Sequence, residues 1–340
     1  MDTSFPTAEE LVSRYADNIK GKIILTTGVT PGSIGASYVK AVAGGSPALL
    51  ILAGRSQEKL DKQAAVVRAT NPAVPLRTLL IDLSSLESTR RAAATVNSWD
   101  DVPRIDVLCN SAAIMAWPYS VSPEGFENQL LTNHVTHFLL TNLIMEKLLK
   151  SDRPRVISVA SSGHRFSPIR WGDMHFEVRT WHTYTHAHGG NFYNPWAAYG
   201  QSKTANMLFA ISLAQKLGGR GLLSYSVHPG AIGTSNLAHH LDILDTWGTD
   251  DGDSKALADQ NSIMGNEELR VSILNSSQGA STYVNVSFNP YIEGNNGAYF
   301  DQLSLPDPLS GNVAPWGTSA SEAERLWRRT EEMVGQRFSY

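Results

Sequence analysis

The sequence predicts an α/β protein with a single doubly wound parallel sheet of about seven strands, helices on both faces and one loop insertion. Three observations support this class. Short apolar runs alternate with segments of helical length from about residue 20 to residue 230. The runs are apolar at successive positions, which is typical of parallel strands buried on both faces. A glycine-rich turn joins the first strand directly to a helix. We expect one domain over residues 1–340.

The first expected elements are a short leading helix and a strand–turn–helix unit. Thr7 and Glu10 have the spacing of a capping box, and apolar residues follow at helical spacing up to Gly21. The apolar run at 22–27 predicts a strand. Residues 34–43 predict a helix, which ends where Gly44 and Gly45 follow it.

The alternation continues along the chain. Further strands are expected at 48–53, 76–81, 105–109, 155–159, 222–227 and 297–300, because each is a short apolar run. Helices are expected at 58–70, 86–97, 126–149, 197–217, 278–286 and 321–334, where apolar residues recur at helical spacing. Residues 20–230 would then form the cofactor-binding and catalytic core. Residues 175–194 are expected to be an insertion, 235–275 a substrate lid, and 276–340 the C-terminal completion of the fold.

Composition and charge exclude several classes of protein. Hydrophobic residues make up 42% of the chain and charged residues 18%, which is a globular composition. A net charge of −4 supplies no broad positive field, so we expect no nucleic-acid partner. The sequence has one cysteine, Cys109, and its start lacks the pattern of a secretion signal, which favours a cytoplasmic location. No apolar stretch approaches the roughly 20 residues that span a bilayer, so we expect no membrane span.

The turn after the first strand, residues 28–35, is a candidate cofactor site. Gly28, Gly32 and Gly35 would let backbone N–H groups approach a pyrophosphate at the positive end of the following helix. Alternatively, the turn only packs this helix against the strand. At the end of the second strand, where an acid would select NAD, the sequence has Arg55 and no acid until Glu58. Because a guanidinium suits a 2′-phosphate, we expect NADP(H), unless Arg55 is only an exposed residue at a helix start.

The strongest catalytic signal lies at the start of the expected helix 197–217. Tyr199 and Lys203 are four residues apart and therefore share one face of the helix. A lysine ammonium near a phenol favours the phenolate, so we expect the pKa of Tyr199 to fall from about 10 towards neutrality. This arrangement would prepare Tyr199 to transfer a proton.

These motifs belong to a longer ordered series. The series is Thr27-Gly28-x3-Gly32-x2-Gly35, Asp82-Leu83, Asn110-Ser111-Ala112-Ala113, Thr132-Asn133-His134, Ser161, Tyr199-x3-Lys203, and His228-Pro229-Gly230 with Thr234. In this order the sequence resembles the short-chain dehydrogenase/reductase family, closest in pattern to its retinol-dehydrogenase-like and fungal metabolite-reductase members. The match extends from Gly28 to about Trp327. It implies a Rossmann-type fold and an NADP-dependent oxidoreductase acting on a CH–OH or C=O group.

The resemblance also implies a catalytic set. Tyr199 would donate a proton to the substrate carbonyl oxygen, and Ser161 would hydrogen-bond the same oxygen. Lys203 would hold the nicotinamide ribose and tune Tyr199, and Asn133 would anchor a water that leads from Lys203 towards solvent. Ser162 remains the alternative to Ser161.

For the cofactor, the resemblance places Asp82 beside the adenine, Asn110 and Ala112 along the adenosine ribose, and the segment from Pro229 to Thr234 over the nicotinamide. Alternatively, Asp82 only caps a strand end and Pro229-Gly230 only forms a turn. The full set of expected contacts is Gly28, Thr30, Gly32, Ser33, Ile34, Gly35, Arg55, Asp82, Leu83, Asn110, Ala112, Tyr199, Lys203, Pro229, Gly230, Ile232 and Thr234.

Three departures from the family pattern affect this assignment. Two residues, Ser33 and Ile34, separate the second and third glycines of the turn where the family pattern has one. Ala113 replaces the last glycine of the usual Asn-Asn-Ala-Gly motif. The interval from Ser161 to Tyr199 is also longer than the retinol-type pattern gives. None of these departures removes a catalytic group.

The substrate pocket is defined by aromatic candidates. These are Trp117, His164, Trp171, Trp196 and Trp247, and if they line a pocket the substrate is lipophilic or aromatic. Packing in the core is the alternative for each tryptophan. We expect no metal site, because the segment with His182, His186 and His188 lacks nearby cysteines or carboxylates. His134 and His137 are expected to be packed residues and not acids or bases.

The favoured function is therefore NADPH-dependent reduction of a ketone or aldehyde on a small molecule, or the reverse oxidation of an alcohol. Two alternatives remain: a non-redox isomerase, dehydratase or cyclase on the same scaffold, and a catalytically silent NADP(H)-binding module. The resemblance also allows a homodimer paired through the helices that carry Asn133 and Tyr199, unless the insertion blocks that surface.

Overall fold

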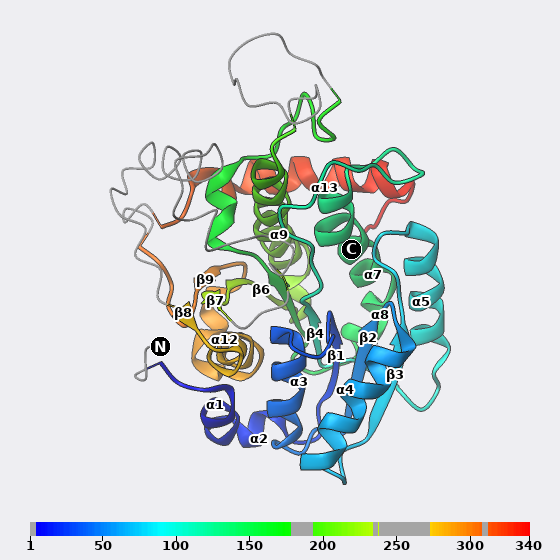
Figure 1. Ribbon diagram of the computed structural model, residues 1–340, viewed down its shortest axis with the longest axis vertical. Coiled ribbons are helices and arrows are strands. Elements are labelled where there is room, and N and C mark those ends of the chain that lie inside the picture. The colour runs from blue at the N-terminus through cyan, green and yellow to red at the C-terminus, as the bar shows by residue number, and fades with distance from the viewer. Residues whose placement is uncertain (1–4, 178–192, 234–236, 238–272, 308–311) are drawn as a thin grey trace.

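Seven parallel strands form the central sheet (Figure 1). The computed structural model describes residues 5–177, 193–233, 237, 273–307 and 312–340. The strands are β1 (Ile23–Thr27), β2 (Leu49–Gly54), β3 (Leu76–Leu80), β4 (Val107–Asn110), β5 (Arg155–Val159), β6 (Leu223–His228) and β9 (Tyr299–Asp301). Their order across the sheet is β3-β2-β1-β4-β5-β6-β9, and every neighbouring pair is parallel. The predicted doubly wound parallel sheet is confirmed.

Helices connect the strands, and polar side chains cap most of them. The α-helices are α1 (Ala8–Arg14), α2 (Ala16–Ile19), α3 (Ile34–Ala43), α4 (Gln57–Thr70), α5 (Leu86–Ser98), α6 (Asn128–Leu130), α7 (Thr136–Leu143), α8 (Met145–Leu148), α9 (Pro195–Leu217), α12 (Ser276–Phe288) and α13 (Ala320–Val334). Ser33, Ser56 and Ser85 each accept a hydrogen bond from a backbone N–H in the first turn of the helix that follows. The capping box of Thr7 and Glu10 is also present.

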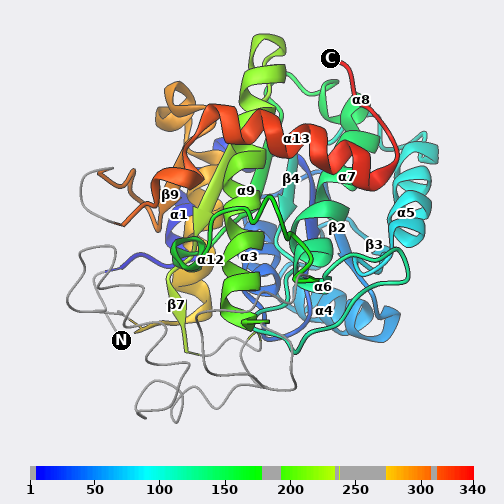
Figure 2. The same ribbon diagram turned by 90° about the horizontal axis from the view of Figure 1, so that it is seen from above.

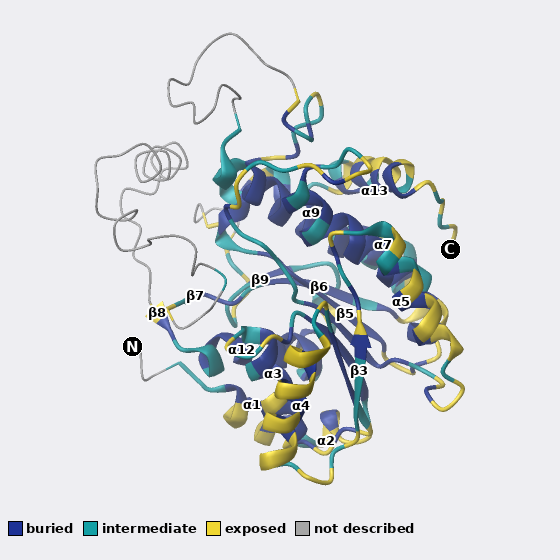
Figure 3. Cartoon of the chain, turned by 45° about the vertical axis from the view of Figure 1, so that its right-hand side comes forward, coloured by how far each residue is buried: buried dark blue, intermediate teal, exposed yellow. Residues whose placement is uncertain are grey.

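Two hydrophobic clusters cover the two faces of the sheet. One cluster joins the strands to α1, α3, α4 and α12, and the other joins them to α5, α7, α9 and α13. Figure 3 shows that α9 is buried along most of its length, whereas α4 exposes its outer side. The long helix with the predicted catalytic pair therefore lies inside the protein and not on its surface.

The segment 126–149 differs from the single helix that its sequence predicts. It contains α6, a π-helical turn (Leu131–Val135), α7 and α8. The hydroxyl of Thr136 donates to the backbone oxygens of Leu131 and Leu83, at 3.0 Å each, and the backbone N–H of Thr136 also reaches the Leu131 oxygen. A side chain and a distant strand end thus stabilise the wider turn, which carries Asn133. Such turns are frequent at functional sites.

Helix α13 lies across α7 and α9, as Figure 2 shows. The ring of Trp327 packs against Phe138 of α7, with centroids 4.8 Å apart, and against Phe209 of α9 at 6.1 Å. The Thr330 hydroxyl lies 3.1 Å from Nε2 of His134. Helix α13 thus packs on α7 and α9, the helices through which the resemblance allows a homodimer to pair.

The expected insertion and lid fall mostly outside the described residues, as do Thr234, Trp247, His182, His186 and His188. At the edges of these regions, β7 (Ala231–Ile232) pairs in parallel with β8 (Ile273–Leu274). In the described part of the chain, no helix is both long and apolar enough to cross a membrane.

Candidate active site

The carboxyl ends of β1, β4, β5 and β6 meet at one edge of the sheet. The strand order reverses between β1 and β4, because the chain first runs outward to β3 and then crosses back. In open α/β sheets, ligands bind outside the carboxyl ends of the strands at such a reversal. The turns after these four strands contain most of the residues that the sequence singled out.

The turn after β1 is shaped by close backbone approaches. Gly28 has a φ of +74°, and a Cβ added there would lie 2.6 Å from Cα of Ala112. A Cβ on Gly35 would lie 2.7 Å from the backbone oxygen of Gly28. Gly32 also has a positive φ, of +86°. These glycines therefore fold the turn tightly against the loop after β4.

The start of α3 offers a positive helix end beside this turn. The Ser33 hydroxyl donates to the backbone oxygen of Gly28 at 2.8 Å and accepts from the N–H of Ala36 at 3.0 Å. The Ser33 side chain is thus used for capping, while Thr30 and Gly32 are exposed and Ile34 is half-buried. The tight turn, with its glycines and the end of a ten-residue helix, fits a dinucleotide pyrophosphate.

Arg55 follows β2 directly and is exposed. Among the described residues its guanidinium makes no ion pair or side-chain hydrogen bond. Ser56, the next residue, caps α4 by accepting from the N–H of Lys59. Arg55 is therefore available to bind an anionic group at the carboxyl end of β2.

The other predicted cofactor residues have different surroundings. Asp82 caps its own turn, because its Oδ1 accepts from the N–H of Ser84 at 3.0 Å and from the Ser84 hydroxyl at 2.7 Å. Asn110 is buried, and its amide donates to Thr141 of α7 at 3.0 Å. The amide of Asn110 is therefore turned towards α7, and its place along a ribose stays a prediction. Leu83 is buried, and Ala112 is half-buried against Gly28.

The turn after β6 contains Pro229 and Gly230, which are both buried. Gly230 has a φ of +90°, and a Cβ there would lie 2.8 Å from Cδ1 of Leu274. Ile232 belongs to β7, and its Cδ1 leaves no room for a Cβ on Gly279 of α12. This turn is therefore held between β8 and α12.

Tyr199 lies next to Ser161, across the turn after β5. The Ser161 hydroxyl accepts from the N–H of Gly163 at 3.0 Å and lies close enough to the phenol of Tyr199 to lower its pKa. A Cβ on Gly163 would lie 2.8 Å from Cε1 of Tyr199, so the phenol ring packs directly on this glycine. Of the two candidate serines, Ser161 is the one placed beside the phenol.

Lys203 follows Tyr199 by one turn of α9, and both side chains are buried. Its ammonium donates to the backbone oxygen of Val159 at 2.9 Å and lies 5.5 Å from the centre of the Tyr199 ring. Burial lowers the pKa of Lys203 to about 7. The two side chains meet as predicted, but the ammonium is directed at a backbone oxygen.

The expected fall in the pKa of Tyr199 is wrong for the protein chain by itself. Burial raises the pKa of this phenol to about 12, and the hydrogen bond with Ser161 opposes the rise only in part. Desolvation disfavours the phenolate. For the same reason Lys203 is only partly protonated at neutral pH, so its charge does little to stabilise a phenolate. Spacing along the helix could not reveal how deeply both groups are buried.

Asn133 is held on all sides by the protein. Its Oδ1 accepts from the N–H of Ile114, and its Nδ2 donates to the oxygen of Ile114 and to the hydroxyl of Ser202, each at 2.9 Å. The Ser202 hydroxyl in turn donates to the backbone oxygen of Tyr199 at 2.7 Å. The π-helical turn, the loop after β4 and α9 are thereby joined at one side chain.

The candidate pocket residues separate into two groups. Trp196 packs edge-on to Tyr199, with ring centres 6.3 Å apart, and Trp117 is 40% exposed on the loop after β4. Trp171 instead donates to Glu322 of α13 at 2.5 Å and lies under Arg325, whose guanidinium is 4.0 Å from the ring centre. Of the described candidate tryptophans, Trp196 is the one that contacts the ring of Tyr199.

His164 also differs from its expected place in the pocket. It has no exposed surface, and burial lowers its pKa to about 4. Nδ1 lies 2.6 Å from the backbone oxygen of Ser161, and Nε2 accepts from the backbone N–H of Ala314 at 3.0 Å. With both ring nitrogens bonded to backbone, His164 supports the turn that carries Ser161.

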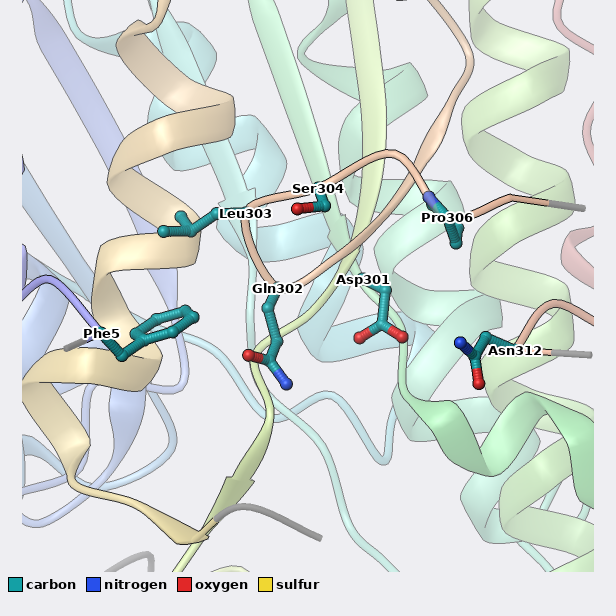
Figure 4. A pocket seen from close by; sticks show the side chains of 7 residues that line it. All are labelled: Phe5, Asp301, Gln302, Leu303, Ser304, Pro306 and Asn312. Carbon is teal, nitrogen blue, oxygen red and sulfur yellow. The ribbon is translucent and has the colours of Figure 1, made fainter. Parts of the chain in front are cut away.

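A cavity of about 290 Å³ lies beyond the end of β9, and none of the residues that line it is a predicted site residue (Figure 4). It is lined by Phe5, Asp301, Gln302, Leu303, Ser304, Pro306 and Asn312. Burial raises the pKa of Asp301, and the charge of Arg165 opposes this rise. Among the described residues, no group of three or more His, Cys, Asp or Glu side chains could hold a metal ion.

Comparison with known proteins identifies relatives over nearly the whole chain. A family model described as short chain dehydrogenase matches residues 22–172. A short-chain dehydrogenase/reductase, prx1, of Penicillium roqueforti is 32% identical over 97% of this chain and 90% of its own. Human retinol dehydrogenase 13 is 31% identical over 93% of this chain and 86% of its own.

Solved structures show the same fold. A protein of unassigned function from Mycobacterium paratuberculosis matches with a TM-score of 0.66 and 25% identity, covering 95% of this chain and 96% of its own. A short chain dehydrogenase of Escherichia coli CFT073, solved in complex with NADPH, matches with a TM-score of 0.59 and 20% identity, covering 85% of this chain and 99% of its own.

Proposed function

The chain belongs to the short-chain dehydrogenase/reductase family, and on that basis we propose that it reduces a ketone or aldehyde on a lipophilic or aromatic small molecule with NADPH, or catalyses the reverse oxidation. The observation that carries this proposal is the position of Tyr199. Its ring packs on Gly163, Ser161 lies beside its phenol, and Lys203 lies one helical turn away.

The glycine turn after β1, the start of α3 and Arg55 would hold the cofactor. When bound, the reduced nicotinamide supplies a hydride to the carbonyl carbon. Tyr199 donates its proton to the carbonyl oxygen, and a neutral, high-pKa phenol is in the correct state to do so at neutral pH. The Ser161 hydroxyl hydrogen-bonds the same oxygen and stabilises the negative charge that develops on it.

Lys203 returns the proton to Tyr199. A pKa near 7 suits this role, because the group can give up and regain a proton at neutral pH. The proposed water at Asn133 would bind the backbone oxygen of this residue, since both polar atoms of its side chain already have protein partners. A carbonyl oxygen has two lone pairs, so it can accept more than one hydrogen bond.

Arg55 supports NADP(H) over NAD(H). The guanidinium is exposed at the carboxyl end of β2 and, within the described residues, has no carboxylate partner that would compete with a phosphate. Trp196 beside Tyr199 and the exposed Trp117 support an apolar or aromatic substrate.

The substitution Tyr199→Phe tests the proposal. We expect turnover with NADPH and a panel of apolar ketones and aldehydes to fall by about 10² to 10⁴-fold, because the proton donor is lost. NADPH affinity, measured by direct titration, should remain close to that of the unmodified protein. Tyr38→Phe is the matched control: this buried tyrosine bonds Ser287 on the opposite face of the sheet, so turnover should be kept.

Three outcomes would contradict the proposal. Full turnover in the Tyr199→Phe protein would remove Tyr199 from the mechanism. A product of unchanged oxidation level, formed without consumption of NADPH, would indicate an isomerase, dehydratase or cyclase. Tight NADPH binding without turnover on any carbonyl of the panel would indicate a silent binding module.

A further inference from the structure

A buried hydrogen-bond chain joins the cofactor turn to the π-helical turn that carries Asn133. Its first member is Thr27, the last residue of β1, which is fully buried. The Thr27 hydroxyl oxygen accepts from the backbone N–H of Ser111 at 3.0 Å and from that of Ala112 at 3.1 Å. Gly28 packs against Ala112, so Thr27 sets the spacing between the two loops.

The second member is His137 of α7, and its protonation pattern follows from its partners. Nε2 of His137 lies 2.9 Å from the Thr27 hydroxyl oxygen. Because that oxygen already accepts from two N–H groups, the Thr27 proton is directed to Nε2, which must be the unprotonated nitrogen. The proton of the neutral ring is then on Nδ1, which donates to the backbone oxygen of Asn133 at 3.1 Å.

The surroundings keep this ring neutral. His137 is 2% exposed, and burial lowers its pKa to about 4. The nearby charge of Lys203 opposes protonation as well. A neutral ring with two fixed partners has no proton to exchange at neutral pH, so His137 is not suited to be an acid or base.

We propose that His137 is a positioning residue that couples the cofactor turn, through Thr27, to the backbone oxygen of Asn133. One end of the ring holds the hydroxyl that sets the Gly28–Ala112 contact. The other end occupies one lone pair of the Asn133 oxygen and so directs the remaining lone pair. This inference rests on the proposed function only for its second half, because the effect on cofactor binding does not require turnover.

Two conservative substitutions separate the two ends of the ring. The amide of asparagine occupies the place of Nδ1, since both groups are bonded to Cγ, whereas the amide of glutamine reaches the place of Nε2. His137→Gln should therefore keep the bond with Thr27 and lose the bond with Asn133. His137→Asn should do the reverse, and His137→Phe should lose both.

The expected results form a crossed pattern. His137→Gln should lower kcat by about 5- to 10-fold and leave NADPH affinity unchanged, the size expected for one lost hydrogen bond. His137→Asn should weaken NADPH binding by a similar factor, measured by direct titration, and keep kcat at saturating NADPH. His137→Phe should show both defects. In the unmodified protein, nitrogen NMR of the imidazole should report a neutral ring protonated on Nδ1.

His134→Asn is the matched control, because His134 is an equally buried histidine whose Nε2 bonds Thr330 of α13 and not the cofactor turn. It should lower thermal stability and keep both kcat and NADPH affinity.

The proposal is overturned if the Gln and Asn variants have the same defects, or if the Phe variant has none. It is also overturned if the ring is protonated on Nε2. A failure of the proposed function would look different: Tyr199→Phe would keep its turnover, while the NADPH titrations of the His137 variants would still give an answer.

Discussion

Gly28 in the turn after β1 and Gly163 in the turn after β5 both lack room for a Cβ atom, but the obstructing atoms differ. A Cβ added at Gly28 would lie 2.6 Å from the Cα and 2.7 Å from the N of Ala112, and Gly28 has a positive φ. At Gly163 the nearest atom is Cε1 of the Tyr199 ring, at 2.8 Å, and the residue lies outside the left-handed region.

The two turns thus meet different demands. The turn after β1 is shaped by the backbone, which must approach the next loop closely to leave space for a dinucleotide. The turn after β5 is shaped by side chains, because it positions Ser161 and supports the ring of Tyr199. Its neighbourhood also buries ionisable groups: the pKa values of Lys203 and His164 are lowered and that of Tyr199 is raised, each by desolvation.

Gly28→Ala should have the largest effect. The substitution adds a clash with backbone, which cannot move cheaply, to the strain of a positive φ. We expect a loss of about 4 kcal/mol in the free energy of unfolding, measured by chemical denaturation, together with a loss of NADPH binding. Gly21→Ala is the control: it has a similar φ of +73° but nothing within 4 Å of the added Cβ. It should cost only the strain, about 1 kcal/mol. Equal effects at the two positions would mean that the contact with Ala112 is unimportant.

Much of the fold is encoded locally, so the sequence predicts it well. The helix Ile34–Ala43 and the strand Arg155–Val159 occur as expected, since a serine cap and a glycine stop delimit the helix and an unbroken apolar run defines the strand. The pairing of Tyr199 with Lys203 is equally local, because four residues make about one turn of helix.

Other features depend on contacts between distant residues and were not predictable. The π-helical turn at Asn133 is stabilised by Thr136 bonding to Leu83, which is 53 positions away. Trp171 contacts Glu322 and Arg325 of α13 and does not lie in the expected pocket. The pKa of Tyr199 is raised and not lowered because its phenol is buried between α9 and the turn after β5. A single sequence contains no signal for any of these contacts.

Gly163→Ala should affect catalysis more than stability. The added Cβ would push the Tyr199 ring by a fraction of an ångström without straining the backbone. We expect kcat to fall by about 10²-fold, because catalysis depends steeply on placement, while NADPH affinity is kept. Gly172→Ala, with nothing within 4 Å of its Cβ, should leave both unchanged. Loss of NADPH binding in the Gly163→Ala protein would show that the two turns are not separate in function.

Lys203→Met tests whether burial of the Lys203 ammonium, beside the turn after β5, lowers the free energy of unfolding. The pKa of Lys203 is about 7 in the folded protein and near 10.5 when the chain is unfolded, so below pH 7 folding must bury a full ammonium. Between pH 7 and 10.5 the unfolded chain binds more protons than the folded chain, and stability of the unmodified protein rises with pH. Methionine removes this cost. We expect Lys203→Met to gain about 2 kcal/mol near pH 6, after allowing for the lost bond to Val159, and to lose turnover.

The gain in stability should shrink as the pH rises towards 10.5, because above this pH lysine is mostly neutral in both states. Denaturation curves at several pH values would show this trend directly. A gain that does not depend on pH would mean that the ammonium of Lys203 is not desolvated. The burial of ionisable groups would then no longer distinguish the turn after β5 from the turn after β1.

Arg55→Ala should have the smallest effect, confined to the cofactor side. Loss of a charge-assisted contact to a 2′-phosphate should reduce kcat/KM for NADPH by about 10-fold and leave that for NADH nearly unchanged. Arg68→Ala, at the other end of α4, is the control for removing a positive charge from the same helix region and should change neither value. Since Arg55 is exposed, stability should also be unaffected. An equal loss with both cofactors would show that Arg55 attracts dinucleotides by charge alone and does not read the phosphate that distinguishes them.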